Sequence, residues 1–254
     1  THQSDRLQQA MVNHVVMIKT FKGICSDLPE IMGDGGRLLV NTSDVYYTGY
    51  SLGGNRGPSL LGLSPDVNRG ALWVGGAAFS HQIERCTQYD QFDDLMESVI
   101  GYPSQLDRAV VISLIQSLWD ATDTNTWTTL SEGWGDRVQP FEMIYIGSIG
   151  DLQISNISTS RALRNADASI LSSSSIHPYG LPITEGGEGT TGNVGVYFDG
   201  GFSHAPEQNL LGQEPHPAHN WVAGVDAAHR MAFEYLFNGY VVDRCDGSCI
   251  YDAA

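Results

Sequence analysis

The pentad Gly49-Tyr50-Ser51-Leu52-Gly53 is the feature that most constrains the fold of this chain. It follows the β-branched and aromatic run 45–48, which is typical of a strand. Small residues at the two ends of the pentad let the backbone turn sharply from a strand into a helix, so that Ser51 stays exposed at the apex. A chain with 29 glycines also contains such pentads by chance, so an ordinary glycine-rich turn is the alternative.

A second strand with a polar end is predicted at 141–151, FEMIYIGSIGD. A glycine-rich loop follows its apolar run. This places Asp151 at the carboxyl end of the strand, where open α/β sheets bind ligands. Asp151 is therefore the predicted acid partner of a histidine. The alternative role is an N-cap for a helix over 157–168, and the two roles are compatible.

The segment 214–221, EPHPAHNW, predicts a loop directly before a helix over 225–237. His219 is the first candidate for the general base, because one ring nitrogen can take the serine proton while the other donates to Asp151. His216 is the alternative base, and His204 is a more remote third option. The remaining histidines are predicted to be surface or core residues: His2, His14, His81, His177 and His229.

The chain order of serine, aspartate and histidine, each at a predicted strand end, resembles the C-terminal part of an α/β-hydrolase of the secreted or cell-envelope esterase/lipase kind. The resemblance spans roughly residues 5–249, with 64–77 as the step from helix to strand after the elbow and 118–120 inside a helical insertion. It implies an α/β fold with a mostly parallel sheet and flanking helices. It also implies that the backbone N–H of Leu52 is one oxyanion donor. Two prolines and a second histidine in the histidine loop depart from the family pattern.

The resemblance implies that Ser51, Asp151 and His219 form a catalytic triad. Such a triad would cleave carboxylic esters or lipids, with peptides, thioesters and polyesters as weaker candidates, through an acyl-enzyme and without a cofactor. The alternative function is a non-catalytic, hydrolase-like structural or binding subunit of a cell-envelope assembly. A dienelactone-type or haloacid-type hydrolase is disfavoured, because the elbow carries a serine rather than cysteine or aspartate.

One departure concerns the strands that precede the elbow in the family. Only 50 residues precede Ser51, and they predict a helix over 5–21 and a loop rather than early strands. A nucleophile strand left at the edge of a parallel sheet exposes an apolar template for aggregation. We therefore expect another polypeptide, such as the N-terminal product of a nicked precursor, to supply the early strands and the second oxyanion donor. A compact variant with a reduced sheet is the alternative.

Periodicity divides the chain into three parts. Apolar residues recur at helical spacing over 89–100 and 106–119, which predicts a helical cap inserted between two strands. The predicted parts are 1–78 with the helix and elbow, 79–140 as the cap, and 141–254 as the C-terminal part of the core with the acid and histidine loops.

The amino-acid composition limits the classes of binding partner and the cellular compartment that we expect. The net charge of −16 with only two lysines disfavours nucleic-acid binding, and no apolar run is long enough to span a membrane. An acidic surface and possible disulfides favour a secreted or cell-envelope location.

The four cysteines suggest disulfides. Cys245 and Cys249 are spaced to close a small loop, and Cys25 and Cys86 can pair with each other or with cysteines elsewhere. A zinc site at Cys245 and Cys249 is disfavoured, because no second pair has finger-like spacing. The nearby aspartates lack the alternation of a calcium loop, so no metal is expected.

Overall fold

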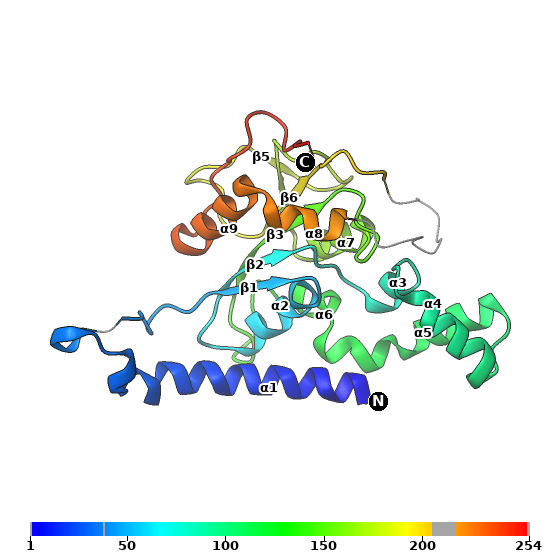
Figure 1. Cartoon of the computed structure of the whole chain (residues 1–254), viewed down its shortest axis with the longest axis horizontal. Helices are drawn as coiled ribbons and strands as arrows, with labels where there is room; N and C mark the ends of the chain where they lie inside the picture. Colours follow the sequence, from blue (N-terminus) through cyan, green and yellow to red (C-terminus); the bar gives the residue numbers. More distant parts are fainter. Residues whose placement is uncertain (1, 38, 205–216, 253–254) are drawn as a thin grey trace.

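The protein folds around a central parallel sheet, which Figure 1 shows between layers of helices. The computed structural model describes residues 2–37, 39–204 and 217–252. Its strands lie in the order β1-β2-β3-β6-β4-β5, and each pairing is parallel, which confirms the predicted fold class. The strands are β1 (Tyr47–Tyr50), β2 (Arg69–Trp73), β3 (Glu142–Ser148), β4 (Ser169–Leu171), β5 (Ile183–Thr184) and β6 (Val194–Phe198).

The predicted helices are present with bounds that differ by a few residues. The predicted helix over 89–100 is divided into α4 and a π-helical turn, which ends at Gly101 with a φ of +85°. No helix within the described ranges is long and apolar enough to cross a bilayer. The helices are α1 (His2–Lys22), α2 (Leu52–Leu63), α3 (Phe79–Ile83), α4 (Tyr89–Leu95), the π turn η4 (Met96–Ile100), α5 (Gln105–Trp119), α6 (Thr124–Thr128), α7 (Asn156–Asn165), α8 (Ala218–Trp221) and α9 (Asp226–Asn238), with short 3-10 turns at Ile24–Asp27, Pro29–Ile31, Asp34–Gly36, Asp120–Thr122 and Val222–Gly224.

Side chains point alternately to the two faces of the sheet along each strand. Both faces are buried, because helices cover each of them. Ala71 and Ile144 belong to the apolar core on the α9 face, whereas Leu72 and Met143 belong to the core beneath α1, α2 and α7. Helix α9 lies on one side of the sheet in Figure 1, and α1 and α2 lie on the other. This double cover explains why β2 and β3 are continuous apolar runs rather than alternating ones.

β1 is an edge strand of the described sheet, as expected from the lack of predicted strands before the elbow. The Ser51 N–H donates to the Trp73 carbonyl at 3.0 Å. Because backbone groups alternate in direction along a strand, the N–H and C=O groups of Thr48 and Tyr50 face away from β2. These groups mark where an additional strand would pair, and the supply of such a strand by another polypeptide stays a prediction.

A buried carboxylate joins helices that lie between β2 and β3 in the chain. Asp123 accepts hydrogen bonds from the backbone N–H groups of Ala78, Phe79 and Asn125 at 2.7–3.0 Å, and from the Gln116 side chain at 3.1 Å. A buried carboxylate is stable only when its oxygens have such partners. Asp123 therefore joins α3, α5 and α6 beside the loop that follows β2.

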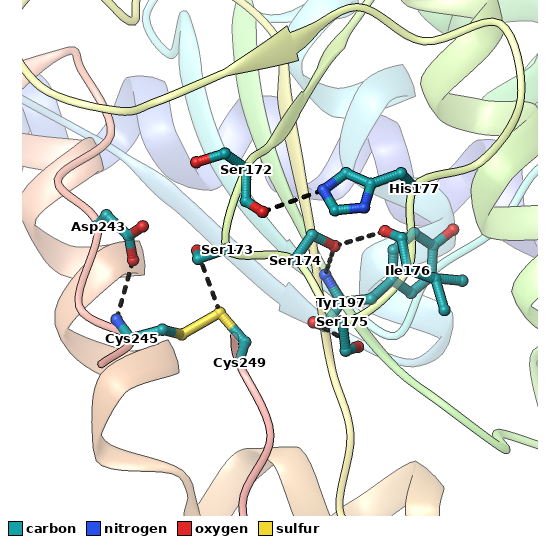
Figure 2. The surroundings of a disulfide bond; sticks show 10 residues. All are labelled: Ser172, Ser173, Ser174, Ser175, Ile176, His177, Tyr197, Asp243, Cys245 and Cys249. Carbon is teal, nitrogen blue, oxygen red and sulfur yellow. Dashed lines mark hydrogen bonds between the residues drawn. A yellow bond between two sulfur atoms is a disulfide. The ribbon is translucent and has the colours of Figure 1, made fainter. Parts of the chain in front are cut away.

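The predicted disulfide between Cys245 and Cys249 is present, and the pairing of Cys25 with Cys86, one of the two alternatives for these residues, is wrong. Cys245 and Cys249 form a disulfide, and Figure 2 shows its contacts with Asp243 and Ser173. The Cys249 N–H also donates to the Ser173 carbonyl at 2.7 Å, which ties the last loop to the segment after β4. Cys25 and Cys86 are free thiols: Cys25 lies in the 3-10 turn after α1, and Cys86 lies between α3 and α4. Figure 1 shows α4 at the side of the molecule opposite to the end of α1 that leads into this turn.

Candidate active site

The predicted turn between β1 and α2 holds Ser51 in a strained backbone conformation. Its φ is +55° and its ψ is −116°, a combination that non-glycine residues rarely adopt. A Cβ on Gly49 would lie 2.5 Å from the Gly53 carbonyl oxygen, so only glycine fits at that position. The neighbouring Leu52 is half exposed, and its N–H belongs to the first turn of α2, where no intrahelical acceptor exists.

A close approach between two backbones sets the position of the elbow. A Cβ on Gly54 would lie 2.5 Å from the Trp73 carbonyl oxygen and 3.1 Å from the Gly75 Cα, whereas a Cβ on Gly53 would meet only the Tyr47 hydroxyl, at 3.4 Å. Gly54→Ala will therefore lower the free energy of unfolding by about 2 kcal/mol or more, because neither backbone can yield.

Gly53→Ala is the matched control for that prediction. It gains helix propensity and is expected to be neutral or to stabilise the protein by up to about 1 kcal/mol. Urea unfolding of the two variants and the wild type measures the difference. Equal stability of both variants would contradict the packing of α2 against the loop after β2.

Asp151 lies at the end of β3 in a loop that a second polar side chain holds. The Asn156 side chain donates to the Ser148 carbonyl at 2.7 Å and accepts from the Gly150 N–H at 3.1 Å. The Asp151 Oδ1 atom accepts from the N–H groups of the second and third residues after it, at 2.8 and 2.9 Å. Its Oδ2 atom is thereby left for another partner. Ser155 occupies the N-cap position of α7, so the alternative of Asp151 as that cap is wrong.

His219 contacts both of the other predicted residues. Its Nδ1 lies 2.7 Å from Asp151 Oδ2, and its Nε2 lies 2.9 Å from Ser51 Oγ. The imidazole and the carboxylate are almost fully buried, while Ser51 is partly exposed. The prediction of a loop around His219 was wrong, because this residue lies within the short helix α8.

The hydrogen-bond partners determine the tautomer of His219. An ionised carboxylate only accepts hydrogen bonds, so Nδ1 carries the hydrogen that is donated to Asp151. The Nε2 atom is then the acceptor for the Ser51 hydroxyl. This arrangement can remove a proton from Ser51 while the buried carboxylate stabilises the imidazolium that forms.

Tyr50 is a contact that sequence reasoning missed. Its hydroxyl donates to the His219 backbone carbonyl, and the two rings pack edge to face with centroids 5.6 Å apart. Burial, together with the nearby Asp151 carboxylate, raises the pKa of the Tyr50 phenol, so the phenol stays protonated and remains a donor. Its position directly before Ser51 in the predicted elbow was the available signal.

The structure does not use the other histidines in the same way. His216, the alternative base, lies outside the described residues. His204 is exposed, and His229 on α9 packs against Trp73 with ring centroids 4.9 Å apart. The described part of the chain therefore brings Ser51, Asp151 and His219 together and leaves His204 at the surface.

Comparisons with known proteins add a distant likeness. A solved structure of acetyl xylan esterase 1 from Thermoanaerobacterium sp. JW/SL YS485 aligns with a TM-score of 0.42 and 14% sequence identity, over 88% of this chain and 52% of that one. The chain thus spans about half the length of that esterase. No protein-family model matches the sequence, and no curated protein matches it.

Proposed function

We propose that the protein is a serine hydrolase that cleaves carboxylic esters. The observation that carries the proposal is the continuous hydrogen-bond chain from Ser51 Oγ to His219 to Asp151, with lengths of 2.9 and 2.7 Å. The three residues are distant along the chain and come from the ends of β1 and β3 and from α8. A nucleophile, its base and the orienting acid need this contact order.

The proposed reaction has two acyl-transfer steps. The Ser51 Oγ attacks the ester carbonyl as His219 Nε2 takes the hydroxyl proton, and the Leu52 N–H donates to the developing oxyanion. The same proton passes to the leaving alcohol, which yields an acyl-enzyme. Water then attacks the acyl group and gives its proton to His219, and Ser51 departs with that proton as the acid is released.

Backbone strain at Ser51 supports catalysis over the binding-only alternative. A positive φ at a non-glycine residue costs about 1–3 kcal/mol. A subunit that used the elbow only for packing would be more stable with glycine at this position. Retention of a strained, partly exposed serine in contact with a buried histidine therefore favours a nucleophile.

We also infer an extracytoplasmic location for this activity. The disulfide between Cys245 and Cys249 is compatible with an oxidising compartment, where such bonds persist.

A fluorophosphonate probe tests the proposed function directly, because it reacts only with an activated serine. We expect covalent labelling of the purified protein, with peptide mapping that places the adduct on Ser51. Ser51→Ala will abolish labelling, and Ser98→Ala, which changes an exposed serine on the cap, will not. An adduct on another serine, or a folded protein that does not react, would contradict the assignment.

A further inference from the structure

A second feature, which no residue of the proposed triad lines, is a cavity of about 440 Å³ between α3 and α7. Arg85, Arg161 and Arg164 line it, together with His81 and a single acidic residue, Glu84. The whole chain has 13 Lys and Arg residues against 29 Asp and Glu residues. A local excess of positive charge in so acidic a chain indicates a built site rather than an average surface.

Two of these arginines are held by neutral partners. The Arg161 Nε donates to Asn125 Oδ1 at 3.0 Å, and the Arg164 Nε donates to the Tyr179 carbonyl at 2.9 Å. Within the described residues, neither guanidinium forms an ion pair with a carboxylate. Their positive charges are therefore fixed in place without being neutralised, which suits binding of an anion.

The hydrogen bond between Arg161 and His81 adds another donor to this cavity. The Arg161 Nη1 lies 2.8 Å from His81 Nδ1. Because a guanidinium has no acceptor, Nδ1 must accept, and the ring hydrogen is on Nε2. The hydroxyl-bearing Ser113 and Ser158 also line the cavity, so most of its polar groups can donate.

The wall of the cavity is connected to the elbow. Ala77 lines the cavity and donates its N–H to the Ser158 carbonyl at 3.1 Å. One residue earlier, the Gly76 N–H donates to the Asn55 side chain of α2 at 2.6 Å. The loop after β2 thus separates the cavity from the helix that Ser51 begins, and α7 follows the loop that carries Asp151.

We propose that this cavity binds the carboxylate of a small organic anion, at a site separate from the proposed triad. A planar guanidinium matches a carboxylate in a two-point contact. The cavity volume lies in the range of sites for organic ligands, so an inorganic ion would fill little of it. Ala77 and Ile157 provide apolar surface for the body of such a molecule.

Binding to a protein that cannot turn over the ester tests the site without relying on activity. Ser51→Ala protein is titrated calorimetrically with 4-acetoxybenzoate and with its neutral methyl ester. We expect the anion to bind at least about 10-fold more tightly than the methyl ester, since charged hydrogen bonds to arginine are the strong ones. Adding Arg161→Gln and Arg164→Gln will remove this preference.

Control variants separate the site from general charge and from folding. Arg137→Gln removes an exposed arginine outside the cavity and will leave the preference intact. The exposed Arg164 is also changed alone, so that the test stands if loss of Arg161 impairs folding. Equal binding of the two esters, binding unaffected by the arginine changes, or tighter binding of inorganic phosphate than of 4-acetoxybenzoate would each overturn the proposal.

Discussion

Replacing His219 with alanine will lower kcat for a soluble aryl ester such as 4-nitrophenyl acetate by about 10⁴-fold or more. The His219 Nε2 atom lies 2.9 Å from Ser51 Oγ and is positioned to accept the hydroxyl proton. Without it, the attack loses its general base and the departing alcohol loses its general acid. The measurement is steady-state release of 4-nitrophenolate by the purified wild type and the variant.

Two further histidine variants make that prediction specific. His177→Ala removes an exposed ring whose Nε2 lies 3.1 Å from the Ser172 carbonyl oxygen, and it will leave kcat unchanged. His216→Ala tests the alternative base, and it will retain most of the activity. Loss of activity in His216→Ala, together with its retention in His219→Ala, would transfer the role of base to residue 216. Free imidazole should partly restore hydrolysis in His219→Ala and not in Ser51→Ala.

The elbow could be predicted from the sequence because its causes are local. A β-branched and aromatic run favours β1, and the glycines at 49 and 53 permit the turn that gives Ser51 its φ of +55°. No long-range contact is needed to anticipate this geometry. The strain at Ser51 follows from the same few residues that predicted the turn.

The choice between the two neighbouring histidines could not be made in this way. His216 and His219 are separated by three residues, and periodicity indicates nothing about which ring reaches the end of β3. The short helix α8 and the hydrogen bond from Tyr50 to the His219 carbonyl decide that orientation. The hydrogen bond joins segments more than a hundred residues apart, a contact that a single sequence does not reveal.

The failed pairing of Cys25 with Cys86 has the same origin. Disulfide formation needs Cα atoms about 4.4–6.8 Å apart, and spacing along the chain sets that distance only for short loops. The four-residue separation of Cys245 and Cys249 met this condition and could be anticipated. Whether Cys25 and Cys86 come close enough to pair depends on how α1 packs across the molecule, which is a property of the folded chain.

Replacing Asp151 with asparagine will lower kcat by about 10⁴-fold with little change in KM. An asparagine can keep its Oδ1 on the two loop N–H groups that Asp151 accepts at 2.8 and 2.9 Å. Its amide NH₂ then faces His219 Nδ1, which must become the acceptor. The hydrogen moves to Nε2, so the ring can no longer take the proton of Ser51.

This prediction separates an orienting acid from a purely structural one. Because the loop contacts survive in Asp151→Asn, its thermal stability should stay close to that of the wild type, whereas Asp151→Ala should lose both activity and stability. Asp167→Asn changes an exposed aspartate with a φ of +51°, a conformation asparagine tolerates, and will leave hydrolysis unaffected. If Asp151→Asn kept wild-type kcat, the 2.7 Å contact with His219 would be a packing contact, and the tautomer would have to be set by another group.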